Sequence, residues 1–180
     1  MNKKFGDFKI RGWKIEDAPS IAKYANNKKI WLNLRDAFPH PYGLPDAESF
    51  IDRAIKEHSK TFFAIATSQE AIGSIGIVIG KDVHRFTAEL GYWLAEPYWG
   101  KGIMTEAVKV ITEYAIQDLG LYRISAEPYS INPSSAKVLE KAGYKFEGTL
   151  RSSVIKDGNV IDQHLFSYIG KKSTQPTLSL

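Results

Sequence analysis

The stretch ELGYWLAEPYWGKGIMTEA, from Glu89 to Ala107, decides the fold of this chain. Its first part alternates like a β-strand, and its last part has the apolar spacing of an α-helix. Between them lie Gly100 and Gly102, two residues without side chains, at the place where the helix must begin. A helix N-terminus carries N–H groups without intrahelical partners, so a glycine-bearing loop before it lets them converge on an anion, usually phosphate. For so short a motif, the alternative is a tight turn that needs glycine for steric reasons alone.

The composition is that of an ordinary globular protein. The chain has 180 residues, 43% of them hydrophobic and 24% charged, which suits one well-buried domain. We expect that domain at 1–170, followed by a frayed tail at 171–180. The net charge of +4 is spread along the chain, so we expect no nucleic-acid partner. Without a long apolar run or an N-terminal apolar segment, we expect no membrane association and a cytoplasmic location.

The order of predicted elements indicates an α+β fold. Helices are predicted over 16–27, 45–60, 102–119 and 132–142, and strands over 8–13, 61–67, 71–80, 86–94, 122–129, 144–151 and 160–170. The three strands between 61 and 94 have connections too short for crossover helices and therefore form an antiparallel meander. Asn132 is suited to cap the last helix and Gly143 to end it. The proline-rich segment 34–45 is predicted to be a loop.

Three segments resemble the GNAT acetyltransferases in order and spacing. They are FKIRGWKIEDAPSIAKY (8–24), AELGYWLAEPYWGKGIMTEAV (88–108) and NPSSAKVLEKAGYKFEGTLR (132–151). Within that superfamily the chain resembles the RimJ/RimL-like branch, the ribosomal-protein N-terminal acetyltransferases and their relatives. The resemblance implies the GNAT fold, with a mixed, mostly antiparallel central sheet flanked by helices and with splayed central strands. It also implies acetyl-CoA as cofactor, with no metal.

The resemblance assigns the cofactor's diphosphate to backbone amides across Trp99 to Met104, with Gly102 at the centre of the signature. Met104 departs from the family pattern, because this last position is usually Gly or Ala. The pantetheine arm is expected along the main chain of Tyr92 to Leu94, where a bulge parts the strand from its neighbour and an N–H group serves as an oxyanion donor. The implied cofactor-binding residues are Tyr92, Trp93, Leu94, Trp99, Gly100, Lys101, Gly102, Ile103, Met104, Thr105, Asn132 and Ser135.

Acyl transfer from a thioester needs a neutral amine, so the site needs a proton acceptor. Glu89 is the first candidate, and the alternative is a structural pair between its carboxylate and a lysine or arginine. Glu127 is the second candidate. The resemblance offers Ser135 as the acid that protonates the leaving thiolate; the alternative is an ordinary polar residue in a first helical turn. Leu139 stands where many family members carry a tyrosine acid, so no such tyrosine is available here.

The acceptor side is the part that the sequence defines least. The residues expected to wall it are Trp31, Arg35, His40, Tyr42, Glu127 and Arg151. The leading function is acetyl-CoA-dependent acetylation of a protein or peptide N-terminal α-amine. Acetylation of a small amine, such as a polyamine, an aminoglycoside or an amino-acid-like compound, is the first alternative, and a non-catalytic acyl-CoA-binding module is the second. Either a monomer or a homodimer fits the sequence.

Overall fold

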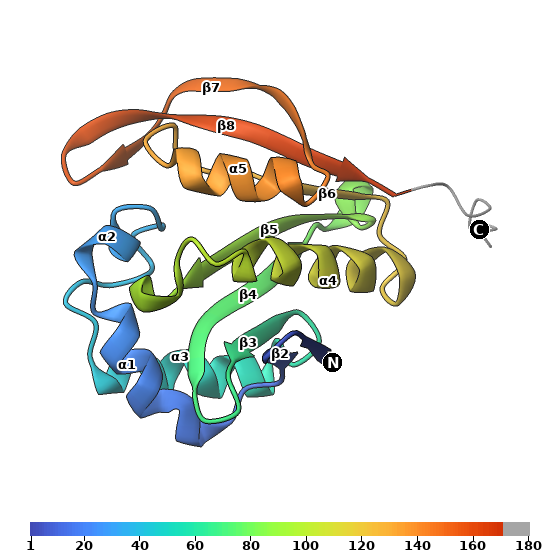
Figure 1. The fold of residues 1–180 in the computed structure, drawn as a ribbon. Helices are drawn as coiled ribbons and strands as arrows, with labels where there is room; N and C mark the ends of the chain where they lie inside the picture. Colours follow the sequence, from blue (N-terminus) through green and yellow to red (C-terminus); the bar gives the residue numbers. More distant parts are fainter. Residues whose placement is uncertain (171–180) are drawn as a thin grey trace.

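An eight-stranded sheet runs through residues 1–170, which are the residues that the structure, a computed structural model, describes. The predicted frayed tail at 171–180 lies outside this range. The strand order across the sheet is β1-β2-β3-β4-β5-β6-β8-β7 (Figure 1). The strands are β1 (Asn2–Phe5), β2 (Phe8–Arg11), β3 (Phe62–Ala66), β4 (Ala71–Ile79), β5 (Thr87–Leu94), β6 (Arg123–Ala126), β7 (Lys145–Lys156) and β8 (Asn159–Ile169).

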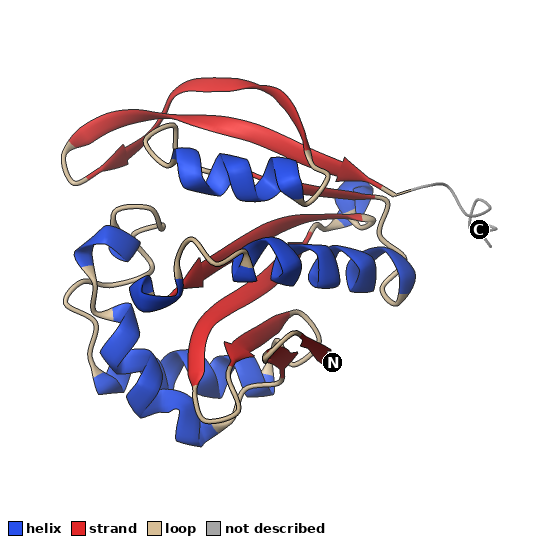
Figure 2. Ribbon diagram, in the orientation of Figure 1, coloured by secondary structure: helices blue, strands red, loops and turns tan. Residues whose placement is uncertain are grey.

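Helices cover both faces of the sheet, as Figure 2 shows. The α-helices are α1 (Ala18–Ala25), α2 (Lys28–Trp31), α3 (Leu44–Lys56), α4 (Ile103–Gln117) and α5 (Pro133–Lys141). Short 3-10 turns are η1 (Ile15–Asp17), η2 (Asp82–His84) and η3 (Glu96–Tyr98). Helices α4 and α5 pack on one face, and α1 and α3 pack on the other. The α+β class predicted from the sequence, with its mixed, mostly antiparallel sheet flanked by helices, is confirmed.

Among residues 1–170, only one pair of neighbouring strands is parallel. β5 and β6 pair in parallel, and every other neighbouring pair is antiparallel. The predicted meander of β3, β4 and β5 is therefore present. β7 and β8 form a long hairpin whose turn residues, Asp157 and Gly158, have φ angles of 50° and 77°. Two consecutive positive φ values match the right-handed twist of the strands that the turn connects.

Two hydrophobic cores lie on opposite faces of the sheet. The larger one joins α4 and α5 to the strands, with Ile75, Ile111 and Leu139 fully buried. The smaller one joins α1 and α3 to the other face, around Ile21 and Ile51. Because each helix buries a single apolar stripe, two separate layers of helices can share one sheet.

Two short elements of the fold are not predicted from the sequence, and one predicted feature is absent. β1 and the one-turn helix α2 are four residues each, too short to give a periodic signal. The expected bulge in β5 is wrong, because its ladder with β4 runs in unbroken register from Ala88 to Leu94. The predicted helix at 45–60 starts at Leu44 and ends at Lys56. Among the described residues, no helix is both long enough and apolar enough to cross a membrane.

Candidate active site

A cleft opens where β5 and β6 part. The two strands pair only from Thr87 to Glu89, opposite Arg123 to Ser125. Beyond that point the cleft, with a volume of about 1160 Å³, is lined by 90–94 on one side and 126–129 on the other. One edge of β5 therefore has no strand beside it. The predicted parting of the central strands is present without a bulge, since β6 simply ends at Ala126 while β5 continues.

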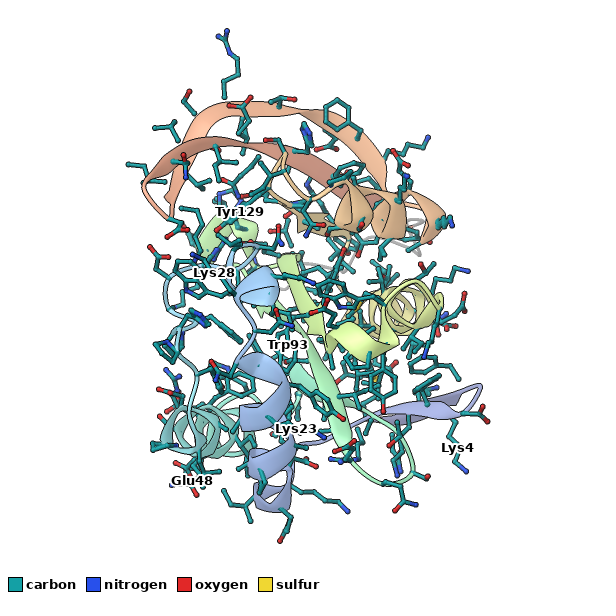
Figure 3. The ribbon with its side chains drawn as sticks, turned by 60° about the vertical axis from the view of Figure 1, so that its left-hand side comes forward. Lys4, Lys23, Lys28, Glu48, Trp93 and Tyr129 are labelled. Carbon is teal, nitrogen blue, oxygen red and sulfur yellow. The ribbon has the colours of Figure 1, made fainter. Side chains whose placement is uncertain are left out.

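The cleft has walls from both halves of the molecule. Figure 3 labels Trp93, on β5, and Tyr129, which lies on the side of the β7–β8 hairpin. Tyr129 is held there by a bridge to Gln163 of β8. The cleft also runs through the sheet, because its lining includes residues of α4 on one face and of α3 on the other. A long ligand can therefore reach from one face of the sheet to the other.

The turn before α4 presents free backbone amides to this cleft. Gly100 and Gly102 have φ angles of 74° and 76°, a left-handed conformation that favours glycine. A Cβ atom built at either position would meet nothing within 4 Å. A side chain at either position would therefore find enough room, because the space beside both residues is open. These positions favour glycine because of their positive φ angles. No side chain caps α4 at Gly102, so the N–H groups of 103–105 are left for a ligand.

The side chains of the predicted diphosphate-binding segment, Trp99 to Met104, contact other residues of the chain. The Trp99 indole Nε1 donates to the Leu94 carbonyl oxygen at 2.6 Å, which ties the turn to the end of β5. The Met104 side chain is buried in the larger core, so the departure from Gly or Ala is accommodated on that side of α4. Lys101 is exposed, with Nζ 5.5 Å from the centre of the Tyr98 ring. All three residues line the cleft.

The start of α5 brings a serine to the cleft. Asn132 caps the helix as predicted, with Oδ1 accepting from the Ser135 N–H at 3.1 Å. The Ser135 Oγ atom lies 2.8 Å from the Tyr92 hydroxyl oxygen. Burial raises the pKa of Tyr92, so this phenol stays protonated. No local sequence pattern indicates this pair, because 43 positions separate its members. Leu139 is fully buried in the core.

Glu89 is paired with an arginine from the opposite wall. Arg35 Nη2 donates to Glu89 Oε1 at 2.5 Å, and this hydrogen bond is the first cause of a raised pKa for Arg35. Both residues line the cleft. The alternative offered from the sequence, a structural ion pair, is thus present, yet Glu89 still lies where a ligand can reach it. Glu127 lines the cleft too, with its side chain and carbonyl accepting from Gln163.

The face of β5 that carries Glu89 also carries a hollow. Glu89, Gly91 and Trp93 alternate onto this face, and Gly91 pairs across the ladder with Gly76. A Cβ at Gly91 would meet nothing within 4 Å, whereas one at Gly76 would meet the Phe62 ring at 2.8 Å. The floor of the hollow is therefore bare backbone at Gly91. Aromatic residues that line the same cleft are Phe38, Phe50, Phe62, Trp93 and Tyr129.

The residues predicted to wall the acceptor side separate into two groups. Arg35, Tyr42 and Glu127 line the cleft. Trp31, His40 and Arg151 do not. The Trp31 and His40 rings stack on each other with centres 5.6 Å apart, and Arg151 is exposed on β7.

Trp31 contributes to holding the acceptor loop instead. Nζ of the buried Lys156 lies 3.8 Å from the Trp31 ring centre and donates to Asp36 Oδ1 at 2.7 Å. These contacts fasten the segment between α2 and α3 to the β7–β8 hairpin. Among the described residues there is no group of three or more histidine, cysteine, aspartate or glutamate residues that could hold a metal ion.

A parted parallel strand pair, an uncapped helix start and an open glycine floor leave room for a long ligand with an anionic group at the start of α4. Comparison with known proteins places the chain in a family. Residues 7–145 match the family described as the acetyltransferase (GNAT) domain. The chain therefore belongs to the GNAT acetyltransferases.

The chain is similar in sequence to an uncharacterized N-acetyltransferase p20 of Bacillus licheniformis, at 27% identity over 91% of this chain and 93% of the relative. The ribosomal-protein-S5-alanine acetyltransferase of Vibrio fischeri has a similar structure, with a TM-score of 0.81 and 25% identity over 94% and 96% of the two chains. A spermidine N-acetyltransferase from Vibrio cholerae, solved with CoA and spermine, shares the fold, with a TM-score of 0.76 and 21% identity over 91% and 95%. The chain is thus an acetyl-CoA-dependent N-acetyltransferase.

Proposed function

We propose that this enzyme acetylates the α-amine of a protein or peptide N-terminus, as ribosomal-protein acetyltransferases do. The observation that carries the proposal is the open space over Gly91 in a cleft lined by aromatic side chains, where Glu89, two residues away on β5, is already paired with Arg35. A polypeptide end can lie on such a floor and present one amine. The likeness to the Vibrio fischeri enzyme supports the same acceptor class.

On the donor side, backbone groups do most of the binding. The N–H groups of 103–105, assisted by the positive end of α4, suit the diphosphate of CoA. The open space at Gly100 and Gly102 leaves room for it. The free edge of β5 at 92–94 can pair with the amides of the pantetheine arm like an added strand. Acetyl-CoA then supplies the activated acyl carbonyl, and an N–H near Tyr92 or Trp93 can stabilise negative charge on its oxygen.

The proton transfers fall to side chains at the same strands. Glu89 Oε1 accepts from Arg35, which leaves Oε2 to take a proton from the acceptor amine, directly or through water. Ser135 can donate a proton to the departing thiolate, and the protonated Tyr92 hydroxyl, 2.8 Å from Ser135 Oγ, fixes its orientation. A thiol with a pKa near ~8.5 leaves readily, so this acid has a modest task.

The alternative acceptor is a small amine such as a polyamine, and the likeness to the Vibrio cholerae enzyme favours it. Two features argue against it. An alkylammonium with pKa near ~10 is harder to deprotonate than an α-amine near ~8. In addition, Glu89, the cleft carboxylate on β5, is already paired with Arg35.

An acceptor screen tests the proposal. The enzyme is incubated with acetyl-CoA and a set of peptides that differ at their first residue, with spermidine as competitor. Thiol release gives the rate, and mass spectrometry gives the acetylated product. The matched control is each peptide with a blocked N-terminus and a free lysine. We expect acetylation of the free N-termini and none of the blocked peptides. Transfer to spermidine alone would refute the proposal.

The cytoplasmic location and the choice between monomer and homodimer stay predictions from the sequence.

A further inference from the structure

Arg35 crosses the cleft from one wall to the other. It belongs to the segment between α2 and α3, 54 positions before Glu89 in the sequence, and its guanidinium reaches the carboxylate on β5. The contact joins the loop on the acceptor side to the strand that carries the proposed base. About two thirds of the Arg35 side chain is exposed, so its remaining N–H donors face the cleft opening and solvent.

The main chain around Arg35 is anchored. Its neighbour Asp36 accepts from Lys156 Nζ at 2.7 Å, and the Lys156 side chain is only 1% exposed. Phe38, three residues on, packs edge-to-face against Trp93 with ring centres 6.0 Å apart. Arg35 therefore projects from a segment that is fastened at two positions directly after it. Most exposed ion pairs are weak because holding long side chains in one geometry costs conformational entropy. Anchoring of the main chain around Arg35 lowers this cost.

Arg35 lies in a locally acidic corner. Glu89, Glu127 and Tyr129 all raise its pKa, with the hydrogen bond to Glu89 as the largest cause and burial acting in the opposite direction. All four residues line the cleft. With the guanidinium removed, neither Glu89 nor Glu127 would have an ion-pair partner among residues 1–170. Two carboxylates so placed would suit a second ammonium group on an acceptor.

We propose that Arg35 determines acceptor specificity: it fills the anionic corner between Glu89 and Glu127 with the protein's own cation and thereby disfavours di- and polyamines. The acceptor that remains favoured carries a single amine and no second cation near it. This inference rests on the proposed function, because it explains why a cleft shared with polyamine-acetylating relatives would select a peptide N-terminus. Arg35 acts here through charge and position and takes no part in proton transfer.

The experiment compares kcat/KM for an N-terminal peptide and for spermidine in wild type, Arg35→Met and Arg35→Lys. Removing Arg35 can also change how Glu89 acts as a base, but this effect is common to both acceptors. The quantity to compare is therefore the ratio of kcat/KM for spermidine to kcat/KM for the peptide. We expect Arg35→Met to raise this ratio about tenfold, mainly through a lower KM for spermidine, since a repelling charge is lost. Arg35→Lys keeps the cation and should restore most of the wild-type ratio. Calorimetric binding of spermidine to the CoA-saturated protein should strengthen in parallel.

Arg53 provides the matched control. It lines the same cleft from α3, and among residues 1–170 it forms no ion pair, so Arg53→Met changes the net charge equally without freeing Glu89. We expect it to alter the ratio by less than about threefold. An unchanged ratio and unchanged spermidine binding in Arg35→Met, or an equal rise in Arg53→Met, would overturn the inference. If wild type fails to acetylate peptides while Arg35→Met still gains spermidine binding, the proposed function fails and the role of Arg35 stands.

Discussion

Replacing Gly102 by alanine separates backbone strain from ligand binding. Gly102 has a φ of 76°, and Gly120, just beyond the other end of α4, has a φ of 67°; a Cβ at either would meet nothing within 4 Å. The left-handed conformation costs an alanine about 1–2 kcal/mol. Both variants should therefore be destabilised by that amount, which lowers Tm by about 2–8 °C in a chain of this size.

The two variants should differ in CoA affinity. Gly102 lines the cleft and Gly120 does not, so only the Cβ at Gly102 enters the space proposed for the diphosphate. Losing one charge-assisted hydrogen bond from an amide to a phosphate costs about 1.5–3 kcal/mol, which corresponds to a roughly 10- to 150-fold weaker Kd. Gly120→Ala should leave the Kd unchanged.

Isothermal titration of CoA into both variants, with thermal unfolding of the same samples, gives the two quantities independently. Equal Kd values for wild type and Gly102→Ala would refute the assignment of the diphosphate to this turn. Equal loss of affinity in both variants would show that the strain, and not the position of the new methyl group, weakens binding.

Three further predictions address catalysis and stability. Glu89→Gln should lower kcat while the CoA Kd stays constant; unchanged turnover excludes Glu89 as base. Ser135→Ala should reduce kcat by about tenfold or less, because a thiolate leaves readily, and Tyr92→Phe should have a smaller effect of the same kind; turnover assays that show no loss in either variant contradict an acid at this place. Hydrogen bonds from Arg123 and then Ser167 lower the pKa of Glu147 to about 2. Because this pKa lies below its unfolded value near 4.5, the stabilisation is complete above about pH 4.5 and disappears as pH falls towards 2. Glu147→Gln should therefore lose under about 1 kcal/mol at pH 7, with no deficit at pH 2, and a deficit that is constant with pH in denaturant unfolding would contradict this origin.

The elements that the sequence predicted correctly are those with local signals. Asn132 and Gly143 mark the two ends of α5, one through a side-chain cap and the other through a φ of 92°. The apolar spacing of α4 and the short connections of the β3–β5 meander are local too. The family resemblance supplied what local signals could not, namely a mixed sheet whose central strands part.

Contacts between distant residues were not predictable in the same way. Nothing near Arg35 in the sequence indicates a bond to Glu89, and nothing near Tyr92 indicates one to Ser135. The buried Lys156 reads as one of many surface lysines until the fold places it against Trp31. These pairings depend on how loops cross the sheet, which is set by tertiary packing. The acceptor side consists mainly of such contacts, so it was the least predictable part of the site.

The most direct test of this account is a crystal structure of the protein with CoA. The account predicts diphosphate oxygens within about 3.2 Å of the amide nitrogens between Gly100 and Thr105, with the pantetheine arm along the free edge of β5. A CoA molecule bound with its diphosphate elsewhere, and this turn still open to solvent, would contradict it.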